Sequence, residues 1–140
     1  MILHNQIQKY TDTCNLEVPD GLPPVRGNSQ QLEQVFINIL LNALQALPDR
    51  TRSVHISAGF DADDDAVWIS FRDNGSGISE QDLGRLMEPF FTTRTDVGGT
   101  GLGLSISRCI VDKHGGSMGF ASTLGGGTTV TVRIPSIRQV

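Results

Sequence analysis

The chain has 140 residues, 38% of them hydrophobic and 19% charged, which is typical of one globular domain and excludes a disordered chain. The formal net charge of −4 argues against broad binding to nucleic acid or to an anionic membrane. No apolar run reaches the roughly 18 residues of a membrane span, and two cysteines without metal-binding spacing favour a reducing compartment, so we expect a cytoplasmic location.

The first predicted elements are short. Residues 1–13 are weakly periodic and predict a short helix or the remnant of a connecting linker. Leu16–Val18 is predicted to be a short strand, because Pro19-Asp20-Gly21 follows it as a turn. We therefore place the domain itself at residues 14–140.

The clearest predicted element is a long amphipathic helix. Asn28, followed three residues later by Gln31, predicts its N-cap and a capping box, and Pro48 ends it. Its apolar side chains keep the i, i+3, i+4 spacing of a core-facing helix; they are Leu32, Val35, Phe36, Ile39, Leu40, Ala43, Leu44 and Leu47.

A stripe of uncharged polar residues follows one side of the same helix; it consists of Gln31, Gln34, Asn38, Asn42 and Gln45. Asparagine has poor helix propensity because its amide competes for backbone hydrogen bonds, so two of them one turn apart suggest a function. An amide oxygen is a neutral ligand that suits Mg²⁺ already bound to phosphates. The alternative is an ordinary solvated helix face.

Two half-buried strands are predicted next, at Val54–Phe60 and Val67–Arg72, joined by an acidic turn. Asp73 shares the parity of the apolar face of the second strand, so its carboxylate should point toward the core, where it needs a hydrogen-bond donor. The glycines that follow would let a ligand approach the backbone, and Asp73 could then accept a hydrogen bond from an exocyclic amine. A simple strand-ending Asp-Gly turn is the alternative.

A short helix is predicted at 79–87 and a loop at 88–100. The loop leads into Gly98–Leu104, where the glycines leave backbone N–H groups open to a ligand. A helix follows at 101–114, and a glycine loop that feeds a helix N-terminus is suited to binding an anion. A merely flexible loop is the alternative.

The last predicted elements are strands at Ser117–Leu124 and Thr128–Ile134, joined by glycines. Thr128 shares the parity of Val130 on the apolar face, so it could reach the same pocket as Asp73. Hairpin-linked strands interrupted by helices predict an antiparallel or mixed sheet with helices on one face. The chain contains neither a GxxxxGK[ST] nor a GxGxxG motif, which excludes an ordinary P-loop and a dinucleotide fingerprint.

These stretches together resemble the ATP-binding catalytic domain of sensor histidine kinases, in the superfamily that includes gyrase, the heat-shock chaperone ATPase and the mismatch-repair ATPase. The N box is similar to Asn38-Ile-Leu-Leu-Asn42-Ala43, and the first G box to Asp73-Asn-Gly-Ser-Gly77-Ile78. The F box is similar to Glu88–Thr93, the second G box to Gly99–Leu104, and the terminal strand signature to Gly125–Pro135. The short segment between the F box and the second G box is most similar to that of the nitrogen-regulation type of kinase.

The resemblance implies an α/β fold: a two-layer α/β sandwich of the Bergerat type, with a mixed sheet of about five strands and three helices on one face. It implies ATP and Mg²⁺ as cofactors. Asp73 would accept a hydrogen bond from the adenine amino group, with Thr128 assisting. Asn42 would coordinate Mg²⁺ and Asn38 would position the terminal phosphate, which makes these two the implied catalytic residues. The other implied nucleotide-binding residues are Gly75, Gly77, Ile78, Phe90, Phe91, Thr93, Arg94, Gly99, Thr100, Gly101, Leu102, Gly103 and Leu104.

The implied activity is transfer of the ATP γ-phosphate to a histidine on a separate dimerisation domain of the parent kinase, with a response regulator as an indirect partner. No nucleic-acid partner and no direct membrane contact of this domain are implied, although the parent could be membrane-anchored. Two positions depart from the family pattern. Gln45 stands where many members carry a cation, and Asn28 stands where many carry an acid, although Asn caps a helix as well as Asp does.

Three alternatives stay open. Hydrolases and ATP-driven clamps of the superfamily carry a glutamate where Asn38 stands, and glutamate can accept a proton from attacking water whereas asparagine cannot. A serine kinase of the anti-sigma type and a nucleotide-sensing module without turnover are the other two. None of the three histidines, His4, His55 and His114, has the sequence context of a phosphoacceptor, so we expect that this chain alone does not phosphorylate itself.

Overall fold

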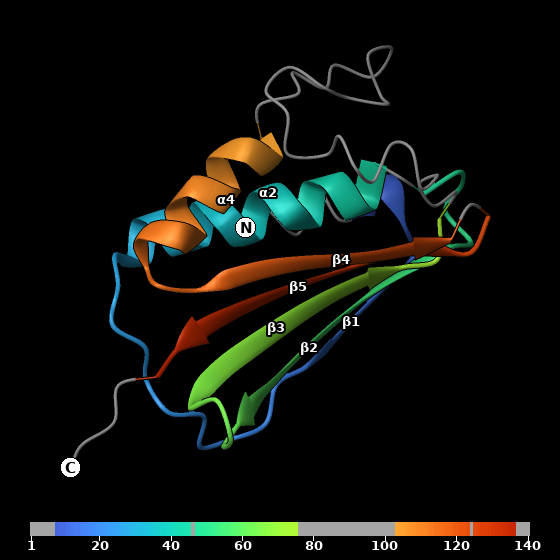
Figure 1. Cartoon of the computed structure of the whole chain (residues 1–140). Helices are drawn as coiled ribbons and strands as arrows, with labels where there is room; N and C mark the ends of the chain where they lie inside the picture. Colours follow the sequence, from blue (N-terminus) through green and yellow to red (C-terminus); the bar gives the residue numbers. More distant parts are fainter. Residues whose placement is uncertain (1–7, 46, 76–102, 124, 137–140) are drawn as a thin grey trace.

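In the computed structural model of the chain, the described residues are 8–45, 47–75, 103–123 and 125–136. They form two layers, in which two helices lie over one face of a five-stranded sheet (Figure 1). The strands are β1 (Thr13–Glu17), β2 (Ser53–Asp61), β3 (Ala66–Asp73), β4 (Ser117–Thr123) and β5 (Gly127–Pro135), and the helices are α2 (Ser29–Gln45) and α4 (Gly103–Lys113).

The sheet is mixed, with the strand order β1-β2-β3-β5-β4. Among the described strands only β1 and β2 pair in parallel, and the other three pairs are antiparallel. The predicted two-layer α/β sandwich with a mixed sheet is therefore confirmed. The third helix, predicted at 79–87, lies outside the described residues. None of the described helices is long and apolar enough to cross a membrane.

The first strand differs from the prediction. It spans Thr13–Glu17 rather than Leu16–Val18, because its extent follows its parallel pairing with β2, from Thr13 opposite Ser53 to Glu17 opposite Ser57. The strand lies at the edge of the described sheet, and Leu16 is 69% exposed, so no buried apolar alternation marks it in the sequence. Thr11 anchors the segment before it, since its side chain is buried and accepts the Thr13 N–H at 3.0 Å.

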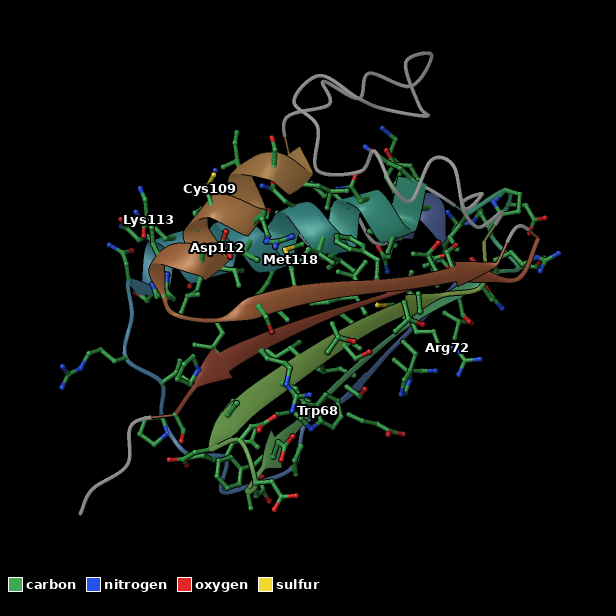
Figure 2. The ribbon with its side chains drawn as sticks, in the orientation of Figure 1. Trp68, Arg72, Cys109, Asp112, Lys113 and Met118 are labelled. Carbon is green, nitrogen blue, oxygen red and sulfur yellow. The ribbon has the colours of Figure 1, made fainter. Side chains whose placement is uncertain are left out.

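The hydrophobic core lies between the helices and the sheet, as the apolar stripe of α2 predicted. Met118 projects from β4 into this space, whereas Trp68 and Arg72 lie on the opposite, open face of the sheet (Figure 2). The most deeply buried apolar side chains come from both layers and fix how α2 and α4 sit on the sheet; they are Val35, Ile39, Leu44, Val54, Val111 and Val132.

The start of α2 is bound to the end of α4. Asn28 caps α2 as predicted, because its Oδ1 accepts the Gln31 N–H at 3.0 Å. The capping box is not closed by the Gln31 side chain; instead the Asn28 N–H donates to His114 Nε2 at 3.0 Å. His114 Nδ1 lies 2.7 Å from the Ile110 carbonyl oxygen, so these two contacts suit the tautomer that carries its proton on Nδ1.

Candidate nucleotide-binding site

Three polar side chains form a row across the helix-covered face of the sheet. Asp73 on β3 lies opposite Thr128 on β5, and Thr128 lies opposite Ser122 on β4. Asp73 is 5% exposed and Thr128 is 7% exposed, which confirms the burial that strand parity predicted for both. The next row along the same face is apolar, with Phe71, Val130 and Phe120.

The Asp73 carboxylate is held by the turn that follows it. Its Oδ1 accepts the Gly75 N–H at 2.9 Å, so this backbone donor fixes the orientation of the carboxylate. Gly127 lies against the Asp73 backbone, because a Cβ built there would lie 2.2 Å from the Asp73 carbonyl oxygen. A glycine is therefore required beside Asp73 on β5.

The two asparagines of α2 lie on the side of the helix that meets α4. Asn38 Nδ2 donates to Ser107 Oγ of α4 at 3.4 Å, and Ser107 is fully buried. Asn42 follows one turn later on the same side and is half-buried. The polar stripe is therefore not an ordinary solvated face at this point, since one of its members joins two helices.

These two groups of residues lie at the same end of the molecule. The helices run antiparallel, because Asn28 at the start of α2 meets His114 after α4, whereas Asn38 further along α2 meets Ser107 in the first turns of α4. The end of α2, the end of β3 and the turn between β4 and β5 all lie at the right of Figure 1. The fold therefore places Asp73 and Thr128 on the sheet at the end where Asn42 lies in the helix layer.

The donor set fits a magnesium ion that is bound mainly by phosphates. The described residues hold no group of three or more His, Cys, Asp or Glu side chains that could bind a metal by themselves. Asn42 offers a hard, neutral oxygen, which suits a cation that keeps waters and phosphates as its other ligands.

Most of the other nucleotide-binding residues implied by the resemblance lie outside the described residues; they are Gly77, Ile78, Phe90, Phe91, Thr93, Arg94, Gly99, Thr100, Gly101 and Leu102. Gly103 is the first residue of α4, so its backbone N–H belongs to the unpaired first turn of a helix, as an anion site requires. Leu104 packs against the core, so only its backbone would be available to a phosphate.

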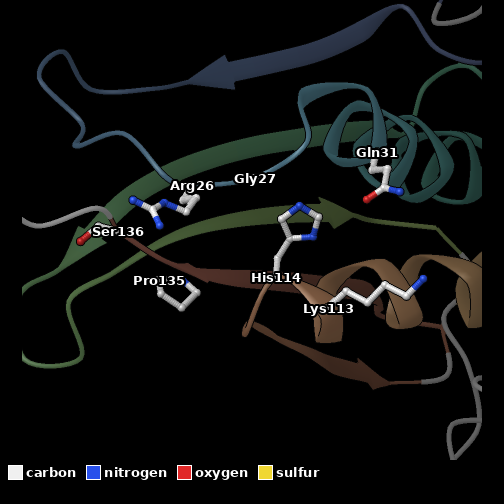
Figure 3. A pocket seen from close by; sticks show the side chains of 7 residues that line it. All are labelled: Arg26, Gly27, Gln31, Lys113, His114, Pro135 and Ser136. Carbon is white, nitrogen blue, oxygen red and sulfur yellow. The ribbon is translucent and has the colours of Figure 1, made fainter.

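A cavity of about 620 Å³ lies at the opposite end of α2, around His114 (Figure 3). Its lining residues are Arg26, Gly27, Gln31, Lys113, His114, Pro135 and Ser136. Pro135 ends β5, the strand that begins beside Thr128, so this cavity is not the predicted nucleotide site.

Sequence reasoning missed Ser122 and Ser107. Ser122 lies on the same face of β4 as Met118 and Phe120, because the three residues alternate along the strand. A polar residue at the end of an otherwise apolar strand face could have indicated a role in the site. Ser107 lies three residues before Ile110 on the buried side of α4 and offered the same signal at helical spacing.

Comparison with known proteins agrees with this geometry. Residues 27–138 match the family described as histidine kinase-, DNA gyrase B- and HSP90-like ATPases. The chain is 43% identical to sporulation kinase E of Bacillus subtilis over 99% of its own length but only 18% of that protein. It is 38% identical to the sensor histidine kinase ZraS of Escherichia coli over 83% of its length and 24% of that protein.

Among solved structures, the catalytic domain of the histidine kinase ThkA superposes with a TM-score of 0.82 at 29% identity, covering 96% of this chain and 86% of that one. The resemblance to histidine kinase catalytic domains is thereby confirmed, whereas the nitrogen-regulation subtype stays a prediction. The chain spans only 18% and 24% of the lengths of these two curated relatives. From the buried Asp73–Thr128 row, the asparagines of α2 and these matches, we conclude that the chain belongs to the family of histidine kinase-, DNA gyrase B- and HSP90-like ATPases.

Proposed function

We propose that this chain binds ATP with Mg²⁺ and transfers the γ-phosphate to a histidine on a separate, helical dimerisation domain of a longer parent kinase. The observation that carries the proposal is the placement of Asp73 and Thr128 on the sheet at the end of the sandwich where Asn42 and the start of α4 lie.

Each described group has a task in this reaction. Asp73 accepts a hydrogen bond from the adenine amino group, and Thr128 contacts the same edge of the base. The first turn of α4 directs unpaired backbone N–H groups at the phosphates. Asn42 would hold Mg²⁺ through its amide oxygen, and the ion would supply charge neutralisation at the phosphates. Phosphoryl transfer depends mainly on such positioning and charge neutralisation.

Asn38 favours transfer over hydrolysis. Its side chain is an amide that donates to Ser107, and an amide cannot take a proton from water as a glutamate would. The attacking group must therefore bring its own base, which a histidine ring with a neighbouring acid supplies. Transfer from that histidine to a response regulator is the implied next step, and we place the domain in the cytoplasm, whether or not the parent is anchored in a membrane.

The described histidines of the chain are not suited to be the acceptor. Both ring nitrogens of His114 are engaged, at the end of α2 remote from Asn42. His55 lies on the open face of the sheet, with Nε2 3.6 Å from Glu17. The acceptor histidine is therefore expected in another domain.

The test is phosphorylation in trans. The chain is incubated with γ-labelled ATP and Mg²⁺, with and without the histidine-bearing helical domain of its parent. We expect acid-labile label on the helical domain, none on the chain alone, and none on a helical domain whose histidine is replaced by glutamine. Asn42→Ala in the chain should abolish labelling.

Other outcomes would identify the alternatives. Phosphate release without the helical domain would indicate a hydrolase, and acid-stable label on a protein serine would indicate a serine kinase. Nucleotide binding without transfer under any of these conditions would indicate a sensing module.

A further inference from the structure

Ser122 contacts Thr128 at the edge of the row that includes Asp73. Its Oγ donates to the Gly127 carbonyl oxygen at 2.9 Å and lies 2.8 Å from Thr128 Oγ1. On the other side of Thr128 lies Asp73. The next row along the same face is apolar and includes Val130.

The number of hydroxyl protons determines the direction of this hydrogen bond. A serine hydroxyl carries one proton, and Ser122 gives it to Gly127. The 2.8 Å contact must then be a donation from Thr128 to Ser122. Thr128 also carries one hydroxyl proton, so its Oγ1 has only acceptor capacity left for a ligand. The Asp73 side chain beside it accepts the Gly75 N–H and is likewise an acceptor.

We propose that Ser122 is a positioning residue for base selection, because it holds Thr128 as an acceptor and so requires a donor on the bound base. This inference rests on the proposed function, in which Asp73 and Thr128 bind the base. A 6-aminopurine presents a donor at this edge. A 6-oxopurine presents a carbonyl oxygen, which would face the lone pairs of Asp73 and Thr128.

Without Ser122 the Thr128 hydroxyl can turn. Its proton would be free to point at the base and donate to a 6-carbonyl oxygen. The variant Ser122→Ala should therefore lower the preference for ATP over ITP, a pair that differs in the 6-substituent and the proton on N1. One neutral hydrogen bond corresponds to about a 2–10-fold change in that ratio.

The experiment is calorimetric titration of the full chain with ATP and with ITP. We expect the ATP/ITP affinity ratio to fall in Ser122→Ala and to be restored in Ser122→Thr, which keeps the hydroxyl and suits a strand. In a Thr128→Val background, which lacks the hydroxyl, Ser122→Ala should leave the ratio unchanged. Ser122→Cys, with only a weak donor and acceptor, gives the same test should Ser122→Ala fail to fold.

Two results would overturn the proposal. One is a loss of ATP and ITP affinity by the same factor in Ser122→Ala, which would make Ser122 a structural residue only. The other is an equal change of ratio in the Thr128→Val background, which would show that Ser122 does not act through Thr128. Failure of the proposed function would look different, because the wild-type chain would then bind ATP and ITP with equal affinity. That result would show that Asp73 and Thr128 do not bind the base, and it would also refute the role of Ser122.

Discussion

The backbone of Gly127 lies so close to Asp73 that a Cβ at residue 127 would be 2.2 Å from the Asp73 carbonyl oxygen. Gly127 also has a φ of +91°, a conformation that other residues adopt only under strain. This contact aligns the start of β5 with the end of β3, and so sets Thr128 opposite Asp73.

Gly127→Ala should therefore reduce both folding stability and ATP affinity. The positive φ alone costs about 1–2 kcal/mol, and the clash with the Asp73 backbone adds to it. Gly125→Ala is the matched control, because Gly125 has a φ of +82° but no atom within 4 Å of a built Cβ. Urea unfolding should show a larger loss for Gly127→Ala, and equal losses would mean that the close approach to Asp73 is unimportant.

Asp73→Asn should weaken ATP binding. The amide would offer a donor where the adenine amino group needs an acceptor, and loss of a charged hydrogen bond costs about 1.5–3 kcal/mol, or roughly 10–150-fold in affinity. Calorimetry measures the change, and Asp63→Asn in the exposed turn after β2 is the control. An unchanged dissociation constant for Asp73→Asn would remove this carboxylate from the binding site.

Asn42→Ala should make ATP affinity less dependent on Mg²⁺. Alanine has a higher helix propensity than asparagine, so a loss of binding is not expected to come from unfolding of α2. Titrations with and without Mg²⁺ should show a smaller ratio in the variant, whereas Gln34→Ala on the exposed side of α2 should keep the wild-type ratio. An identical Mg²⁺ response in Asn42→Ala and wild type would exclude Asn42 as a ligand.

His114→Ala should destabilise the fold by about 0.5–1.5 kcal/mol without changing ATP affinity, since it removes the bond to the Asn28 N–H at the end remote from Asp73. Gly27→Ala provides a second test, because a Cβ there would lie 2.4 Å from the His114 ring. Thermal unfolding should show that Gly27→Ala is harmful in wild type and much less so in His114→Ala. Purely additive effects would contradict the packing of Gly27 against His114.

The two cysteines should differ in reactivity. Burial raises the pKa of the Cys14 thiol, so less of the reactive thiolate is present, whereas Cys109 lies exposed on the outer side of α4. At pH 8, iodoacetamide should label Cys109 first, and denaturant should abolish the difference. Because the pKa of Cys14 is higher in the folded chain, its contribution to stability is present below the unfolded pKa and decreases as the pH rises through the folded pKa. Faster labelling of Cys14 in the folded chain would contradict its burial.

Local periodicity in the sequence was enough to predict several features of the fold and of the candidate site. The two-residue period of a strand was enough to place Asp73 and Thr128 on the buried face, and both are buried. The apolar stripe and the Asn28 cap were enough to place α2, because an amphipathic helix and its cap are encoded within a few turns. The family boxes, being local motifs, likewise identified the family.

Contacts between residues far apart in the sequence could be found only in the folded chain. Ser122 meets Thr128 only because the pairing of β4 with β5 sets that register. His114 accepts the Asn28 N–H, which the Gln31 side chain would accept in a capping box. The two residues, Asn28 and His114, lie 86 positions apart in the sequence. The extent of β1 is set by its parallel partner rather than by its own pattern. No local period encodes such pairings, because they depend on how the layers pack, so the sequence predicted the buried faces but not the partners that the side chains find there.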